Sequence, residues 1–99
     1  MIDSAIESLE HEWEQDTGFF GLMRQGRLCG KGLSRVLTIL DGISLDNSEY
    51  INRKLVEILW YIPTFMIWQK SRLISVNEQE FESAITEITN RLEDILGVP

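Results

Sequence analysis

The sequence has little cysteine, histidine or proline, with one, one and two of these in 99 residues. Because Cys29 stands alone, no disulfide can form within the chain. Because His11 is the only histidine, a zinc site with the usual several nitrogen or sulfur ligands is disfavoured. The longest apolar-rich stretch, residues 55–68, contains Glu57 and Pro63 and is shorter than the roughly 20 apolar residues that span a bilayer. We therefore expect no metal and no membrane.

Basic residues are also scarce. Nine Lys and Arg stand against sixteen Asp and Glu, for a formal charge of -7. Such an excess disfavours a nucleic-acid backbone or an anionic membrane as the ligand and favours a basic partner. Residues 1–13 lack the basic-then-apolar order of a secretory signal, so we expect a cytosolic protein. The length fits a single domain over residues 1–99, without repeats or low-complexity tracts.

The charges that are present are segregated along the chain. Residues 1–16 hold six acids and no base, whereas residues 17–40 hold four bases and no acid. On a helix the spacing of the first segment separates a carboxylate stripe from an apolar one: Asp3, Glu7, Glu10 and Glu14 beside Ile2, Ile6, Leu9 and Trp13. The pattern predicts an amphipathic helix over residues 3–16, capped by Asp3 or Ser4 and closed by Gly18.

The middle of the chain predicts two shorter helices. Five of the seven glycines fall within residues 18–32, where they disfavour a long helix, so we expect a short helix over residues 19–28. A second pattern starts near Ser34 and ends at Asp41 or Gly42, with apolar residues on one face.

The second half predicts two longer helices. One begins with a pattern like a capping box at Asp46 and Glu49 and has apolar residues at helical spacing up to Pro63. At Pro63 we expect a kink or break before the helix continues to residue 68. The other is capped by Ser75 or Asn77 and ended by Gly97 and Pro99; its inner face is Phe81, Ala84, Ile85, Ile88, Leu92 and Ile95. With no period-2 strand, the predicted fold is all-α: a compact bundle of about five helices with a Pro-kinked central helix.

Three features suggest chemistry, and each has a simpler interpretation. The segment Gly26–Gly32 resembles a phosphate-binding loop, but its glycine spacing is one residue short, Gly32 replaces the Ser or Thr that would hold magnesium, and no strand precedes it. It is more simply a turn that connects two helices. His11 could share a metal with neighbouring carboxylates but is more simply a solvated side chain. Cys29 lies among bases and is more simply a small turn residue. We expect no enzyme, no catalytic residue and no cofactor.

The segment from Trp60 to Trp68 is apolar on nearly every side of its helix. Its aromatic residues are most simply core, because they occur at helical spacing among aliphatic residues. A small bundle has too few helices to cover every side, so an uncovered side would form a dimer seam or a docking patch.

The whole chain, in size, acidity and helical layout, resembles the small immunity proteins encoded beside bacterial polymorphic toxins, including those of contact-dependent growth inhibition systems. The opening HEWEQDTGFFGLMRQG and the segment LWYIPTFMIWQK carry the resemblance. It implies a protein without catalysis that neutralises one cognate toxin domain by covering its active site or a nearby surface. Many such toxins are basic nucleases.

Charge alone then selects the residues expected to meet a basic toxin, by replacing nucleic-acid phosphates or by pairing with Lys and Arg. The first set is Glu7, Glu10, Glu14 and Asp16, and the second set is Glu80, Glu82 and Glu87. The alternative function is a helical adaptor or regulatory subunit that docks through residues 60–68, as a homodimer in its simplest form. Salt and charge reversal would weaken the first kind of complex and leave the second largely unchanged.

Overall fold

A computed structural model of the chain describes residues 2–45, 51–73 and 76–98, and these residues are helical with no strand among them. The elements are α1 (Ile2–His11), α2 (Phe19–Arg24), α3 (Gly30–Asp41), α4 (Arg53–Gln69), the short 3-10 helix η1 (Lys70–Arg72) and α5 (Glu78–Leu96). The predicted all-α bundle of about five helices is confirmed.

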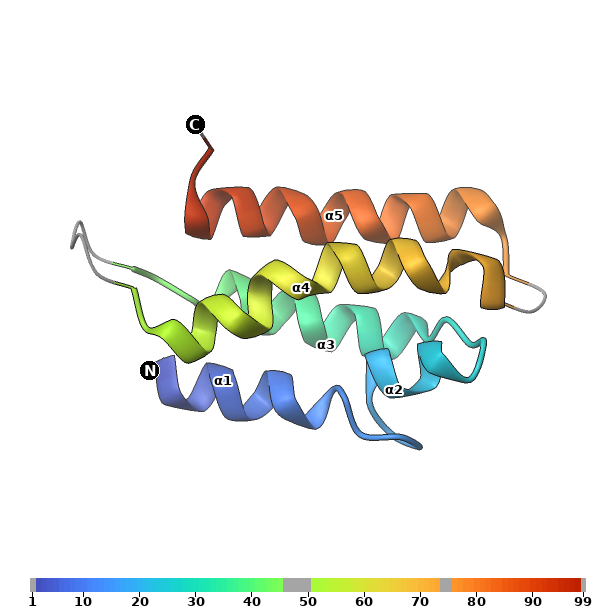
Figure 1. Ribbon diagram of the computed structural model, residues 1–99, viewed down its shortest axis with the longest axis horizontal. Helices are drawn as coiled ribbons and strands as arrows, with labels where there is room; N and C mark the ends of the chain where they lie inside the picture. Colours follow the sequence, from blue (N-terminus) through green and yellow to red (C-terminus); the bar gives the residue numbers. More distant parts are fainter. Residues whose placement is uncertain (1, 46–50, 74–75, 99) are drawn as a thin grey trace.

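The helices form two thin layers. The shortest extent of the molecule is 19 Å, close to two helix diameters. In Figure 1, α1 and α5 run along opposite edges, and α4 lies in front of α3 between them. Both α3 and α4 pack against α1, α2 and α5. One side of α4 therefore faces the bundle and the other faces outward.

The core is built from one apolar stripe of each helix. Residues with almost no exposed surface come from all five α-helices: Leu9, Phe19, Phe20, Met23, Val36, Leu40, Leu55, Leu59, Ile62, Met66, Phe81, Ala84 and Ile88. Ile6, Leu9 and the half-buried Trp13 lie on the inner face that the sequence predicts for the first helix. Burial of these stripes supplies most of the folding free energy.

The first helix is shorter than predicted. It ends at His11 rather than Asp16, and Asp3 and Ser4 lie inside it instead of capping it. The chain turns because Glu12 points inward: its backbone carbonyl accepts hydrogen bonds from the amides of Phe20 and Gly21, at 2.8 and 3.3 Å. In a regular α-helix that carbonyl would instead accept a hydrogen bond from the amide four residues later.

The glycine-rich region also differs from the prediction. Helix α2 ends at Arg24, not at residue 28, because Gly26 adopts φ 84° and the amides of Gly26 and Arg27 bond back to Met23 and Leu22. These two bonds make a Schellman motif, which stops a helix.

Helix α3 begins at Gly30, four residues before Ser34. The glycine at position 32, which weakened the sequence prediction, allows α3 to lie close to Phe19 of α2: a Cβ there would come 3.0 Å from the Cβ of Phe19. The predicted turn between the two helices is therefore confined to residues 25–29.

Helix α4 starts at Arg53, where the side chain of Asn52 accepts a hydrogen bond from the amide of Leu55 at 3.2 Å. The predicted start at Asp46 and Glu49 lies outside the described residues. The helix continues through Pro63 without a break, and its axis bends partway along in Figure 1.

Helix α5 matches the prediction closely. Asn77 caps it, with its side-chain oxygen accepting from the amides of Gln79 and Glu80 at 2.8 and 3.1 Å. The alternative cap, Ser75, lies outside the described residues. Gly97, at φ 84°, ends the helix, and its amide donates to the carbonyl of Glu93.

Candidate protein-binding surface

The outward side of α4 exposes three large apolar side chains. Trp60, Ile67 and Trp68 keep 57%, 57% and 63% of their surface exposed. They lie on one side of the helix over two turns, with the half-buried Thr64 between them. We call Trp60, Thr64, Ile67 and Trp68 the α4 face. The assignment of Trp60 and Trp68 to the core is thus wrong, and the expectation that a small bundle leaves one side of this helix uncovered is confirmed.

The sequence of α4 explains why this face is apolar. Residues 58–69 contain no charged side chain. The inward side chains, Leu59, Ile62, Phe65 and Met66, are buried against the other helices. An amphipathic surface helix would carry charges on its outer side. Over residues 58–69 the outer side carries no charge, and a partner that covered it would remove its apolar surface from water.

The exposed rings rest on a connected group of aromatic side chains. Tyr61 contacts the rings of Trp60 and Trp68, with ring centroids 5.7 and 6.3 Å apart. It also stacks on Trp13, at 6.0 Å, and Trp13 packs on Phe65 at 4.6 Å. These contacts hold the α4 face on a packed base, which reduces the entropy that its side chains lose when a partner binds.

Helix α1 packs on both α3 and α4, so its two flanks border different helices. One flank of α1, with Ser8 and Glu12, faces Arg35 and Thr38 of α3 across a shallow pocket of about 440 Å³. By helical spacing Glu7 and Glu10 lie on the opposite flank, toward α4.

Contacts of Trp13 connect the end of α1 to the aromatic side chains of α4. Glu10 is three residues before Trp13, and the amide of Trp13 donates to the carbonyl of Glu10 at 3.1 Å. Trp13 in turn stacks on Tyr61, whose ring touches Trp60 and Trp68. Trp13 and Tyr61 therefore link the end of α1, the helix that carries Glu7 and Glu10, to the α4 face.

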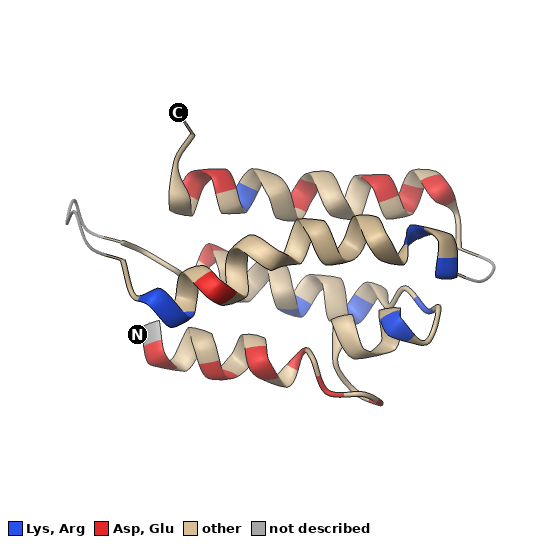
Figure 2. Ribbon diagram, viewed as in Figure 1, with Lys and Arg blue, Asp and Glu red and all other residues tan. Residues whose placement is uncertain are grey.

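The free charges on this flank are Asp3, Glu7 and Glu10. All three are exposed, and none forms an ion pair with another residue in the described part of the chain. Figure 2 shows the acidic positions spaced along α1 at the lower edge of the molecule. We call Asp3, Glu7 and Glu10 the α1 acidic flank.

The other two residues of the first predicted set lie in the turn after α1 and have local partners. Glu14 accepts hydrogen bonds from His11, at 3.0 Å, and from the hydroxyl of Thr17, at 3.1 Å. The hydrogen bond with Glu14 raises the pKa of His11, and the same bond lowers the pKa of Glu14. Asp16 accepts from the side-chain amide of Gln25 at 3.2 Å. Both carboxylates extend the acidic surface beyond α1.

The structure does not bring the second predicted set onto one face. Glu80 and Glu87 border a pocket of about 530 Å³ with Leu28 and Leu33, on the α3 side of α5. Glu82 lies on the α4 side and pairs with Lys70. In Figure 2, α5 and its acids run along the edge opposite α1. One flat basic surface therefore cannot meet both predicted sets at once.

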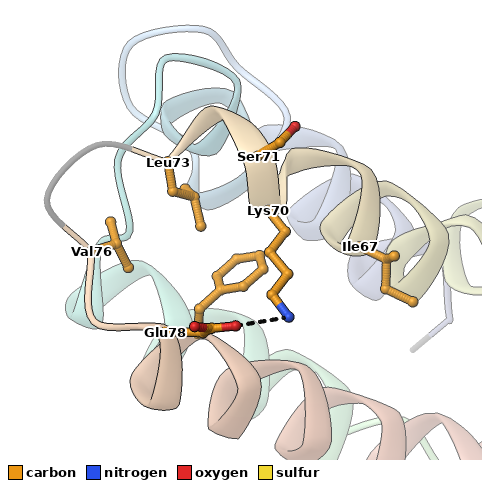
Figure 3. A pocket seen from close by; sticks show the side chains of 7 residues that line it. Ile67, Lys70, Ser71, Leu73, Val76 and Glu78 are labelled. Atoms are coloured by element: carbon orange, nitrogen blue, oxygen red, sulfur yellow. Dashed lines mark ion pairs between the residues drawn. The ribbon is translucent and has the colours of Figure 1, made fainter.

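A pocket of about 470 Å³ lies at the end of α4 next to Ile67. Leu73, Val76 and Phe81 line it, and Figure 3 shows Lys70 reaching across it to Glu78. The Lys70 ammonium lies 3.3 Å from the Glu78 carboxylate and also pairs with Glu82. Hydrogen bonds to Glu82 and then Glu78 raise the pKa of Lys70. The pocket extends the α4 face toward α5 and is open enough to receive an apolar side chain.

Cys29, one of the three features that suggested chemistry, lies at the start of a helix. Cys29 precedes α3, and its Sγ accepts a hydrogen bond from the amide of Gly32 at 3.4 Å. Within residues 2–45, 51–73 and 76–98, no three His, Cys, Asp or Glu side chains gather closely enough to hold a metal ion. Across those same residues, no helix has the length and apolar content needed to cross a membrane.

Neither a protein-family model, nor a curated protein sequence, nor a solved structure matches the chain.

Proposed function

We propose that this chain is a non-catalytic immunity protein that neutralises a basic bacterial toxin in the cytoplasm. The surface that binds the toxin is the α4 face together with the α1 acidic flank. The observation that carries the proposal is the apolar side of α4, where Trp60 and Trp68 are more than half exposed. The neighbouring helix α1 carries the carboxylates of Glu7 and Glu10, which lack an ion-pair partner among the described residues.

The two halves of this surface act differently in binding. A buried tryptophan contributes some 150–250 Å² of contact, and tryptophan is enriched among the residues that dominate binding free energy. The α4 face therefore supplies affinity. Carboxylates at the edge of an interface mainly speed association and reject partners of the wrong charge. Glu7 and Glu10 therefore supply attraction toward the Lys and Arg of a nuclease-like surface.

The proposed surface includes only part of the residues selected from charge alone. Glu7 and Glu10 lie on the α1 acidic flank, and Glu14 and Asp16 extend it at the turn. Glu80 and Glu87 lie outside the proposed surface, on the α3 side of α5. Their position makes them controls, because both are exposed glutamates on another helix of the same molecule. Glu80 has no ion-pair partner among the described residues, and Glu87 pairs with Arg91 at 3.8 Å.

The test measures whether the chain inhibits a toxin domain that it captures. The tagged chain is purified from its native host at low and high salt, captured proteins are identified by mass spectrometry, and each captured toxin domain is assayed for activity with and without the chain. We expect to capture one basic toxin domain at low salt and to lose it from the tagged chain at high salt. Its toxic activity should fall when the chain is added. Glu7→Lys/Glu10→Lys should weaken inhibition, and Glu80→Lys/Glu87→Lys should leave it unchanged. Equal inhibition by both variants would refute the assignment to α1.

The alternative, a homodimeric adaptor that uses the same α4 face, is favoured by the apolar character of that face. Sedimentation of the purified chain distinguishes the two functions. A monomer at micromolar concentration is expected for the immunity protein. A stable dimer that Trp60→Ala/Trp68→Ala converts to a monomer would favour the adaptor.

A further inference from the structure

We infer that the α4 face binds arginine side chains of the partner in preference to lysine side chains. The inference rests on the proposed function for the choice of surface and adds the chemistry of the residue that the surface receives. Three features of the molecule carry it: an internal guanidinium on the same aromatic group, the absence of charge on the α4 face, and the carboxylates beside it.

The molecule already holds one guanidinium on its aromatic group. The Cζ atom of Arg24 lies 5.2 Å from the ring centroid of Trp13 and 5.3 Å from that of Phe65. Arg24 is exposed and reaches these rings from α2. A guanidinium near a ring centroid within about 6 Å is attracted by the electron density of the ring face. Rings of the same connected group, Trp60 and Trp68, remain exposed for a second guanidinium.

The lack of charged side chains around the exposed rings favours a cation that tolerates partial loss of its hydration water. Residues 58–69 carry no charge, so a cation above Trp60 or Trp68 would meet apolar surface. Arginine suits this position because its guanidinium is weakly hydrated and stacks flat on aromatic rings, whereas the lysine ammonium is strongly hydrated. The carboxylates of Glu7 and Glu10 give the partner's remaining N–H donors an acceptor at the edge of the same surface.

The start of α4 supplies a carboxylate close to one of the exposed rings. Arg53 places its Nε 3.2 Å from the carboxylate of Glu57, and both side chains are exposed. Glu57 is three residues before Trp60, on the same side of the helix. An incoming arginine can therefore stack on Trp60 and compete with Arg53 for Glu57.

A second copy of this chain is a poorer occupant of the face. In a two-fold pair across α4, the α1 acidic flank would meet either the same flank or the α5 side of the partner copy. On that α5 side Glu78 and Glu82 share the single Lys70. With a net charge of -7 on each copy, both arrangements place acid against acid. A cationic partner removes this repulsion.

The experiment uses two amphipathic peptides of the same length, built from leucine and alanine with either arginine or lysine at every charged position. Binding to the full chain is followed by the indole N–H signals of Trp13, Trp60 and Trp68 in ¹⁵N-labelled protein. We expect the arginine peptide to bind about threefold more tightly than the lysine peptide, with shifts at Trp60 and Trp68. Glu7→Gln/Glu10→Gln should weaken binding of both peptides, and that of the arginine peptide by the larger factor.

The matched variant is Trp60→Leu/Trp68→Leu, which keeps the face apolar and removes its rings. We expect the two peptides to bind this variant equally. Equal binding of the two peptides to the unmodified chain, an unchanged preference in the variant, or no binding of either peptide would each overturn the inference. None of these results touches toxin inhibition, which is measured separately, so the proposed function can stand when the arginine preference fails.

Discussion

The carboxylate of Glu12 forms a two-pronged ion pair with the guanidinium of Arg35, 23 residues later in the chain. Oε2 lies 2.8 Å from Nε and Oε1 lies 3.0 Å from Nη2, and Oε1 also accepts from the amide of Phe19 at 2.9 Å. The Glu12 side chain is 7% exposed and that of Arg35 is 47% exposed. The pair fixes the turn after α1 against α3, and this turn places Trp13 on the aromatic group of α4.

Replacing Glu12 with glutamine should therefore destabilise the fold. The amide can still accept one hydrogen bond, but it leaves Arg35 without a charge partner and loses one prong of the pair. We expect the free energy of unfolding, measured by urea denaturation, to fall by about 2 kcal/mol, below the 3–5 kcal/mol typical of fully buried pairs because Arg35 is half exposed. Glu7→Gln, on the exposed flank, should change it by less than about 0.5 kcal/mol. Equal effects of the two substitutions would contradict the role of the pair.

The same pair makes stability depend on acid. Burial alone would raise the pKa of Glu12, but hydrogen bonds from Arg35 and the amide of Phe19 outweigh it and lower the pKa below the ordinary value of 4.5. A carboxyl with a lowered pKa in the folded state stabilises fully above the ordinary value, and this contribution disappears as the pH falls through the folded pKa. The gap in unfolding free energy between the original chain and Glu12→Gln should narrow as the pH falls from 5 toward about 3. A gap that stays constant would show that the charge of Glu12 is not responsible.

Two glycines in the first turn of α3 provide a matched pair of substitutions. An added Cβ at Gly32 would meet Phe19 at 3.0 Å, whereas one at Gly30 would meet nothing within 4 Å. We expect Gly32→Ala to lower the thermal midpoint, at a cost of about 1–3 kcal/mol for crowding the α2–α3 contact. Gly30→Ala should be neutral or stabilise by up to about 1 kcal/mol, because alanine reduces the freedom of the unfolded chain. The reverse order of midpoints would exclude the close packing seen here.

His11, the last residue of α1, should titrate above its ordinary pKa of 6.5, chiefly because Glu14 accepts its hydrogen bond. A histidine with a raised pKa stabilises the folded state fully below 6.5, and this contribution is lost as the pH rises through the raised value. NMR titration of the His11 ring should therefore give a pKa that moves down toward 6.5 in Glu14→Gln. Mutation of Glu80, which lies on another helix, should leave the titration unchanged.

Helix existence and inner faces could be predicted from the sequence, because apolar spacing is a local property. Phe81, Ala84 and Ile88 on α5 and the Asn77 cap were read correctly in this way. The end of α1 could not be predicted from local spacing. It depends on Arg35, which lies 23 residues after Glu12 in the chain and holds the Glu12 side chain inward. Likewise, local spacing could not show that the glycine at position 32 belongs in α3. It is needed there because α3 packs closely against Phe19 of α2.

The candidate site was predictable only in part, for the same physical reason. Local spacing placed Glu7 and Glu10 on one stripe of an exposed helix. It could not show that Glu80 and Glu87 face α3 while Glu82 pairs with Lys70, because these differences depend on which helices pack beside α5. Nor could local spacing show that Trp13 is half-buried while Trp60 and Trp68 are exposed. All three occur at helical spacing with aliphatic residues, and only packing decides which side of a helix is covered.

The three tryptophans should therefore separate stability from binding. Trp13 is half-buried and packs on Phe20, Phe65 and Tyr61, so Trp13→Ala should lower the free energy of unfolding by about 3 kcal/mol. Trp60→Ala and Trp68→Ala remove mostly exposed surface, and each should change it by less than about 1 kcal/mol. Urea denaturation followed by far-ultraviolet circular dichroism measures all three without relying on tryptophan emission. A stable, folded Trp60→Ala/Trp68→Ala chain that no longer inhibits its toxin would locate binding on the α4 face, whereas full inhibition by that chain would remove this face from the proposed site.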